Sequence, residues 1–193
     1  MSHAAQSAIP VNASDVACID LVNSAFTDHL GAGAGGDRIA SAQWQDWFLD
    51  RYGLKPEGQR SPPLEELVTL RRDLRRTLEK WASRTALSRH DVRLLDARLS
   101  AAPVRQRVAQ DAGRLELALE PVRRDWAWVL ASIAASAVEL IRTGDPRRLK
   151  SCGNPKCSWM FYDETVNRSR RYCSPNPCGS LIRVRRFRGG VGT

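Results

Sequence analysis

Four cysteines in the last quarter of the chain constrain its fold more than any other feature of the sequence. They form two pairs with the same C-x4-C spacing, fifteen residues apart: Cys152 with Cys157, and Cys173 with Cys178. Structural zinc is held in a tetrahedron, most often by thiolates or imidazoles that arrive as two local pairs. Both four-residue loops are rich in Gly, Asn and Pro, which let a chain turn tightly around an ion. The pattern predicts one structural Zn²⁺ whose coordination sphere is filled, with no position left for a substrate.

Two disulfide bonds are the alternative use of these cysteines, and they require an oxidising compartment. The first eleven residues lack the basic stretch followed by an apolar run that marks a secretory signal. No stretch approaches eighteen consecutive apolar residues, so we expect no membrane span. We therefore expect zinc-bound thiolates and a cytoplasmic location. The fifth cysteine, Cys18, lies in an apolar run and is expected to be a small buried side chain.

The positive charge of the protein is concentrated around the paired cysteines. The 193 residues carry a net charge of +9, from 30 basic and 21 acidic side chains. From Asp145 onward there are eleven basic and three acidic residues, a net of +8, which leaves +1 for residues 1–144 (nineteen basic, eighteen acidic). So dense a positive charge favours phosphate backbones, because binding releases counterions. We expect a near-neutral domain over residues 1–145 and a basic zinc-finger module over residues 146–193.

Hydrophobic periodicity predicts a mainly α-helical first domain with one small β-hairpin. Apolar residues recur at helical spacing in residues 16–26, 41–53, 61–81, 88–99 and 124–142. Candidate N-caps precede three of these helices: Ser14 or Asp15, Ser41, and Ser88, which forms a capping box with Asp91. In the 88–99 helix, Val92, Leu95 and Leu99 are expected to point inward. In the 61–81 helix, Arg71, Arg72, Arg75 and Arg76 alternate with acidic residues, and a solvated face is favoured over a second nucleic-acid contact.

The hairpin is predicted from alternation with period two in residues 104–108 and 115–119. A turn around residues 111–113 joins the two strands. This pairing is expected to bring Arg105 and Arg107 opposite Glu116 and Glu120.

The segment between and after the cysteine pairs carries the candidate nucleic-acid contacts. The aromatic residues Trp159, Phe161 and Tyr162 are expected to pack on the metal site, since so small a module has little else for a core. Arginines then cluster on both sides of the second cysteine pair, and residues 181–188 are expected to form a short helix. A solvated basic tail is the alternative to phosphate contact. The candidate contacts are Arg168, Arg170, Arg171, Arg183, Arg185, Arg186 and Arg188.

These motifs resemble a known family. Residues 149–163, 167–174, 178–179 and 185–188 are similar to the CGNR zinc finger, and the first domain, from residues 18–24, resembles the ABATE domain that usually precedes it. The resemblance implies a bacterial, stress-linked transcription regulator whose finger binds DNA and whose helical domain senses an effector or forms a homodimer. The Asn and Arg that name the finger are replaced here by Ser180 and Leu181. We expect the zinc site to survive this change, because all four cysteines are present.

The sequence thus favours a zinc-dependent regulator that binds duplex DNA through the phosphate backbone. No catalytic constellation is visible, so we do not expect an enzyme. Two alternatives stay open: a zinc-stabilised adaptor for RNA or protein, and a small-molecule enzyme with a basic appendage. Asp20 and Asn23, polar residues within the apolar first helix, are candidates for an effector pocket. Burial with local hydrogen bonds or helix-end capping is the alternative role of both.

Overall fold

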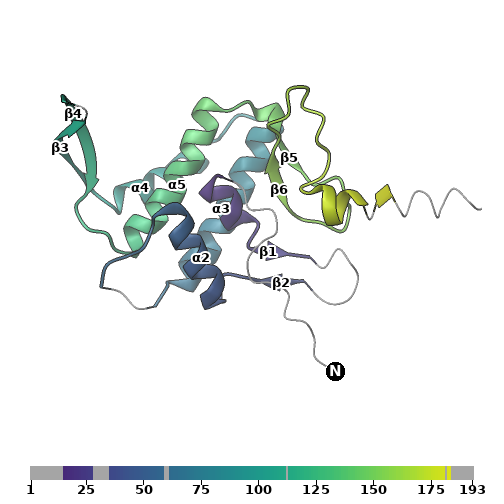
Figure 1. Ribbon diagram of the computed structural model, residues 1–193, viewed down its shortest axis with the longest axis horizontal. Coiled ribbons are helices and arrows are strands. Elements are labelled where there is room, and N and C mark those ends of the chain that lie inside the picture. Colours follow the sequence, from purple (N-terminus) through teal and green to yellow (C-terminus); the bar gives the residue numbers. More distant parts are fainter. Residues whose placement is uncertain (1–14, 28–34, 59–60, 112, 181, 184–193) are drawn as a thin grey trace, which may run out of the picture.

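Helices form the body of the protein, as the periodicity predicts. The computed structural model describes residues 15–27, 35–58, 61–111, 113–180 and 182–183. Within those ranges, five α-helices and three separate two-stranded antiparallel sheets follow one another along the chain (Figure 1). A four-cysteine module follows the helical region at its C-terminal end. The predicted fold class, mainly helical with a small hairpin and a terminal metal module, is confirmed.

The first helix is shorter than the apolar pattern predicts. Helix α1 covers only Ala17–Val22, and its N-cap is Val16, without a side-chain hydrogen bond, so the expected capping role of Asp15 is wrong. Ser14, the other expected cap, lies outside the described residues. The helix ends where Ser24 donates its hydroxyl to the Leu21 carbonyl, the local competition that polar side chains offer to helical bonding. The following strand β1 (Ala25–Phe26) pairs with β2 (Gly36–Asp37) instead of extending the helix.

Capping chemistry sets the bounds of the next three helices. Helix α2 (Ala42–Tyr52) begins at Ser41 and ends at Gly53, whose φ of 62° is the left-handed conformation that glycine adopts freely. Helix α3 covers Leu64–Ala82. Helix α4 (Arg89–Ser100) starts with the predicted capping box between Ser88 and Asp91. These helices lie where the sequence places them because their start and stop signals are local.

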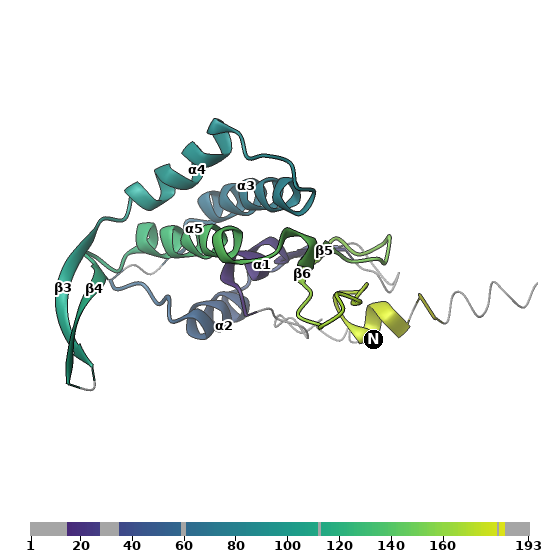
Figure 2. The same cartoon turned by 90° about the horizontal axis from the view of Figure 1, so that it is seen from above.

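Helix α5 (Trp126–Thr143) packs against α1 and α3, and these three helices form the centre of the body (Figure 2). All six residues of α1 are buried between them. By length and hydropathy α5 would also be long and apolar enough to cross a membrane, but 44% of it is buried inside the protein. Its buried side chains, among them Val129, Ile133 and Ala137, belong to the main hydrophobic core.

Two expectations about side-chain direction are corrected by the packing. In α4, Val92 is 54% exposed and Leu99 is 36% exposed, so only Leu95 of the expected three packs against the core. In α3, the Arg72 side chain is 73% exposed, as a solvated face requires, whereas Arg71 is only 13% exposed. Arg71 donates two hydrogen bonds of 2.6 Å to the Asp37 carboxylate. The arginine therefore fixes the β1–β2 segment to α3.

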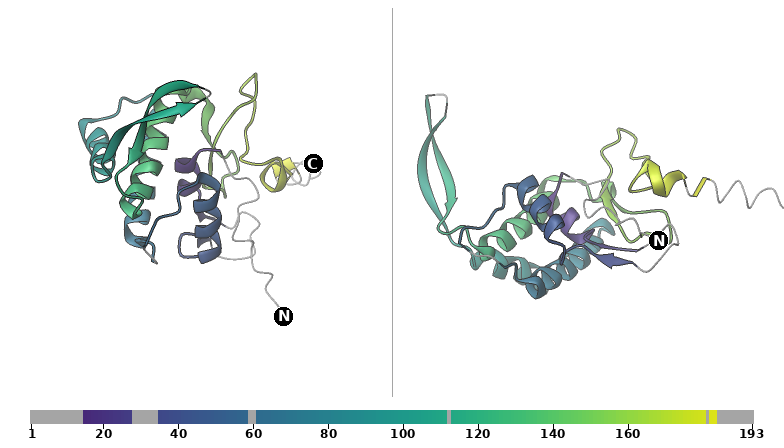
Figure 3. Two further views of the ribbon diagram at one scale, coloured as in Figure 1. Left: turned by 60° about the vertical axis from the view of Figure 1, so that its left-hand side comes forward. Right: turned by 60° about the horizontal axis from the view of Figure 1, so that its bottom comes forward.

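The predicted hairpin is confirmed as β3 (Val104–Asp111) and β4 (Arg114–Pro121), turning at Gly113 with φ 83°. Arg105 lies opposite Glu120, and the guanidinium groups of Arg105 and Arg107 approach its carboxylate to 3.5 and 3.2 Å. The expected role of Glu116 is wrong, because that residue lies opposite Ala109. The hairpin projects from the end of the body opposite to the cysteine module (Figures 2 and 3).

The cysteine module begins with a 3₁₀ turn, Pro146–Arg148, and the strand pair β5 (Leu149–Ser151) and β6 (Met160–Tyr162). A π-helical turn, Pro175–Gly179, carries the last cysteine. Leu149 and Met160 belong to the same buried cluster as the helices, so the module shares the main core. The expected helix over residues 181–188 lies outside the described residues, apart from residues 182 and 183.

Candidate metal centre and basic face

The four paired cysteines come together in space with the geometry of a tetrahedral site. Their Sγ atoms all lie within 4.8 Å of one another. The Sγ atoms of Cys157 and Cys173 are 3.8 Å apart, and those of Cys173 and Cys178 are 3.6 Å apart. Four thiolates around zinc at about 2.3 Å would lie about 3.8 Å apart. The two known separations match those of a zinc tetrahedron, and the cluster therefore fits Zn²⁺.

Backbone hydrogen bonds hold the two cysteine loops in register. The Cys157 amide donates to the Asn154 carbonyl at 2.8 Å and closes the first loop, and the Gly179 amide donates to the Ser174 carbonyl at 3.1 Å beside the second. The Gly153 amide donates to the Arg171 carbonyl at 2.8 Å and joins the two. A Cβ atom at position 153 would lie 2.9 Å from that same carbonyl oxygen, so only glycine permits this approach.

The close approach of the cysteines shifts the pKa values of their thiols in opposite directions. Hydrogen bonds from Cys157 and Cys173 lower the pKa of Cys152 to about 2. The same contacts, seen from the other side, raise the pKa of Cys173, and burial raises the pKa of Cys178. Ionisation of one cysteine thus makes ionisation of the neighbouring thiols less favourable, because like charges so close together repel. A divalent cation at the centre would remove that conflict, since metal ligands are deprotonated together.

A buried asparagine supports the cluster from outside. Asn154 is fully buried, and its Nδ2 group lies 3.7 Å from Cys178 Sγ while its Oδ1 accepts from the Lys156 amide at 3.1 Å. Outer groups of this kind orient metal ligands and spread their charge. The sequence marks Asn154 only as a turn former, and nothing in its spacing indicates the contact with Cys178.

Aromatic side chains pack on the cluster as expected, except that Tyr162 packs against the main helical core instead. Phe161 is buried with the cysteines, and Trp159 and Tyr172 are partly buried against them. Arg170 lies over the Phe161 ring at 4.7 Å. Its guanidinium also donates to the carbonyls of Tyr172, at 3.0 Å, and Cys173. The Arg170 guanidinium therefore makes these hydrogen bonds within the module itself.

Asp163 organises the loop that leads to the second cysteine pair. Its buried carboxylate accepts from Lys150 Nζ at 2.6 Å, from the Thr165 hydroxyl at 2.6 Å and from the Arg170 amide at 3.0 Å. Burial alone would raise the pKa of Asp163, but the hydrogen bonds from Lys150 and Thr165 hold it well below its usual range. The carboxylate is therefore ionised, and it neutralises one of the module's own cations. Sequence spacing gives no sign of this role.

The structure separates the predicted arginine contacts into different environments. Arg168 approaches Asp145 at 3.5 Å, and Arg170 is used internally as described. Arg171 is exposed, and among the described residues its guanidinium has no hydrogen bond or ion pair. Arg183 is exposed and bonds weakly to the Gly179 carbonyl at 3.4 Å. Arg185, Arg186 and Arg188 lie outside the described residues.

Two family models match the chain and together cover almost all of it. Residues 148–189 match the CGNR zinc finger. Residues 15–144 match ABATE, whose description is "Putative stress-induced transcription regulator". The protein belongs to the ABATE family. The resemblance in the sequence is confirmed for both segments, and the finger match agrees with the thiol geometry on Zn²⁺ as the cofactor. None of the curated proteins matches the chain.

The residues that replace the family's Asn and Arg, Ser180 and Leu181, follow the fourth cysteine after one glycine. Ser180 donates its hydroxyl to the Pro175 carbonyl at 3.2 Å, across the turn that carries Cys178. Leu181 lies outside the described residues. The change to Ser and Leu leaves the four Sγ atoms close together, as expected from the retained cysteines.

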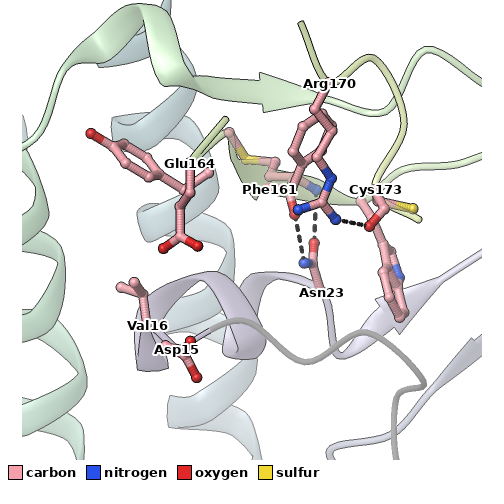
Figure 4. A pocket seen from close by; sticks show the side chains of 10 residues that line it. Asp15, Val16, Asn23, Phe161, Glu164, Arg170 and Cys173 are labelled. Carbon is pink, nitrogen blue, oxygen red and sulfur yellow. Dashed lines mark hydrogen bonds between the residues drawn. The ribbon is translucent and has the colours of Figure 1, made fainter. Parts of the chain in front are cut away.

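Asn23 joins the ABATE domain to the finger. Its Nδ2 group donates to the Met160 carbonyl at 2.8 Å, and its Oδ1 accepts from the Met160 amide at 2.9 Å (Figure 4). Both contacts are buried. Asn23 also lines a cavity of about 90 Å³ together with Arg170 and Cys173 of the finger. The residue that caps the C-terminus of α1 therefore satisfies both backbone groups of a residue in β6.

Asp20 is buried on another side of α1. Its carboxylate accepts from the Tyr52 hydroxyl at 2.7 Å and lies 3.9 Å from the Arg51 guanidinium. The structure thus places Asp20 against α2 and Asn23 against the finger, and it does not bring the two together in one pocket. Burial with hydrogen bonds, the alternative that the sequence left open, describes both residues.

Further contacts across the same junction come from Arg75, which was expected on the solvated face of α3 and instead reaches the finger, and from Thr27 and Arg38, which carry no signal in the sequence. Arg75 of α3 donates to the Ser158 carbonyl at 2.8 Å, and Thr27 donates to the Lys156 carbonyl at 2.5 Å. Arg38 lies between two aromatic rings, 4.0 Å from the Phe26 ring and 5.4 Å from that of Trp159. The junction therefore combines a shared apolar core with polar contacts from three separate segments of the ABATE domain.

Proposed function

We propose that this protein is a cytoplasmic transcription regulator in which a zinc-stabilised finger binds the phosphate backbone of duplex DNA. The observation that carries the proposal is an open groove beside the metal cluster. Arg170, Arg171 and Arg183 line it, together with Ser169, Tyr172, Pro175 and Gly179, and no acidic residue is among them. An open groove with exposed arginines and no carboxylate suits an extended anion better than a small substrate.

Charge distribution supports the same proposal. The net charge of +8 beyond residue 144 lies in the segment that the finger occupies. Several of its cations are neutralised internally: Lys150 by Asp163, and Arg147 by Asp145 at 3.0 Å. Arg171 and Arg183 remain turned toward the groove, and we assign them the phosphate contacts, joined by Arg185, Arg186 and Arg188. We assign Arg168 and Arg170 the role of shaping the loop that presents Arg171.

Four thiolates would occupy every position around the zinc ion and leave none for a substrate, and the family description names a regulator. Both support a protein without catalytic activity. We propose that residues 1–145 and 146–193 are two functional domains over a shared core. The ABATE domain would respond to an effector, and the finger would hold the DNA. We propose a joining role for Asn23 and Asp20 in place of effector contact, because their polar groups already have protein partners.

Salt dependence of DNA binding tests this function. Each phosphate contact that is lost flattens the plot of log K against log salt by about 0.9. Arg171→Ala combined with Arg183→Ala should lower affinity for a fluorescent duplex and flatten the slope by about two units. Arg72→Ala, which removes an exposed arginine from α3, is the matched control and should change neither quantity.

An unchanged slope in the double variant would overturn the assignment of the groove. Competition between the duplex and a structured RNA at fixed salt separates the proposal from the RNA adaptor. Tighter binding of the RNA would contradict a DNA regulator, because A-form and B-form helices present different grooves.

A further inference from the structure

The β3–β4 hairpin has two chemically different faces. Residues that lie opposite each other in the ladder share a face, and successive residues alternate between faces. The register pairs Val104 with Pro121, Gln106 with Leu119, Val108 with Leu117, and Gln110 with Leu115. These eight residues form one face, here called the leucine face, which contains no charged side chain. The opposite face contains Arg105, Arg107, Ala109, Arg114, Glu116, Ala118 and Glu120.

The leucine face is open to solvent along its whole length. Leu115, Leu117 and Leu119 are 75%, 72% and 67% exposed, and Val108 and Val104 are 63% and 55% exposed. Figure 3 shows the hairpin standing away from the helical body. Five large aliphatic side chains at these exposures present on the order of 500 Å² of apolar surface, the upper end of what monomers carry in one patch.

Such a surface is unlike a solvated arm. A two-stranded hairpin is marginal by itself and gains stability when an apolar face is covered. Here the charged residues gather on one face and the apolar ones on the other, the pattern of a sheet with one buried side. Isolated exposed leucines need no explanation, but a continuous face of this size indicates an interaction site.

We infer that the leucine face binds the leucine face of a second copy of this chain. Contact between identical faces is what a two-fold axis produces. The absence of charge on the face removes the like-charge repulsion that self-association would otherwise create, and leaves no ion to be buried without a partner. The two hairpins stack as layers about 10 Å apart, with side chains of both copies between them.

The available area agrees with a dimer of moderate strength. Two leucine faces together supply on the order of 1,000 Å² of apolar surface, near the lower limit for a specific interface. Pairing of strand edges alone does not account for the pattern, because it would leave both leucine faces in water.

This dimer contact goes beyond the proposed DNA binding and does not depend on it. The hairpin and the finger lie at opposite ends of the body (Figures 1 and 2). A dimer formed through the hairpins would therefore leave the two metal centres away from the contact. Loss of dimerisation and loss of DNA affinity per chain can then be measured separately.

The test is the mass of the zinc-loaded full chain in solution as its concentration rises from about 1 μM to about 1 mM. Light scattering or sedimentation should show a rise from 21.5 kDa to twice that mass. Leu115→Ser combined with Leu117→Ser should raise the dimer dissociation constant at least about a hundredfold, since four buried leucines are lost per dimer.

The matched control changes the neighbouring positions of the same strand on the other face. Arg114→Ser combined with Glu116→Ser preserves the net charge and introduces the same two serines, and the dissociation constant should stay within about threefold of the parent, under 1 kcal/mol. Circular dichroism and zinc content show that each variant is folded. A parent chain that stays at 21.5 kDa throughout, or a leucine variant that dimerises like the parent, overturns the inference. Open-ended association in place of a dimer also overturns it.

Discussion

Replacing Asn23 by Ala should destabilise the whole protein far more than a typical polar substitution. The side chain accepts from the Met160 amide and donates to the Met160 carbonyl, at 2.9 and 2.8 Å, in a buried position. Alanine removes both hydrogen bonds and leaves both backbone groups of Met160 without a partner. Because β6 shares its core with the helices, the penalty falls on the ABATE domain and the finger together.

The magnitude follows from those two orphaned groups. A buried donor or acceptor that loses its partner costs about 1–3 kcal/mol. Two of them give about 2–6 kcal/mol, and a chain of this size loses about 2–4 °C in Tm per kcal/mol. The neighbouring cavity of about 90 Å³ has room for a water that could replace one bond, which favours the lower half of the range.

Urea unfolding of the zinc-loaded full chain, followed by tryptophan fluorescence, measures this loss as a shift in midpoint. Asn167→Ala, which removes an exposed asparagine from the finger, is the matched control and should lie within about 0.5 kcal/mol of the parent. A chelator competition should also show faster zinc release from Asn23→Ala. A variant as stable as the parent would refute the reasoning, because it would mean that Met160 does not depend on the ABATE domain.

Three further perturbations test the finger and the capping box. Cys157→Ser should abolish stoichiometric zinc in metal analysis and, because Met160 lies in the shared core, lower the Tm of the helices as well; a helical Tm equal to that of the parent would contradict this. Gly153→Ala should speed zinc loss to a chelator, because its Cβ would collide with the Arg171 carbonyl; an unchanged rate would mean that the loops yield easily. Hydrogen bonds from Lys80 and Ser88 hold the pKa of Asp91 below its usual range in the folded protein. The stability that this carboxylate adds is therefore complete above its unfolded pKa of about 4 and is lost as the pH falls through its lower folded pKa. Asp91→Asn should therefore cost about 1–2 kcal/mol at pH 7, and its urea midpoint should converge with that of the parent in strong acid; a constant difference across pH would contradict the assignment.

Features with a local cause could be predicted from the sequence. Ser41, Gly53 and the Ser88–Asp91 capping box act within three or four residues of the backbone that they bond. The hairpin follows from alternation and a glycine turn, and the metal cluster from two pairs of cysteines. In each of these features the interacting residues lie close together in the sequence, so their spacing is enough to predict the structure.

Features that depend on distant partners could not be predicted. Asn23 and Met160 are separated by 137 residues, and Arg71 reaches Asp37 across 34. A polar residue on an apolar helix signals only that something must satisfy it, which is why an effector pocket was a reasonable expectation for Asn23. Val92 shows the same limit for an apolar residue. Helical spacing places it on an apolar face of α4 but does not show whether another element covers that face.

The two hydrogen bonds between Asn23 and Met160 also limit how the finger can be exchanged between proteins. Excised as residues 146–193, it would take Leu149 and Met160 into water and leave a gap among the helices. A chimera in which only the finger is replaced should therefore be unstable. A stable chimera would take α1 and Asn23 from the same protein as the finger. The finger and residue 23 would therefore have to be transferred together, so this finger cannot be moved between proteins as an independent module.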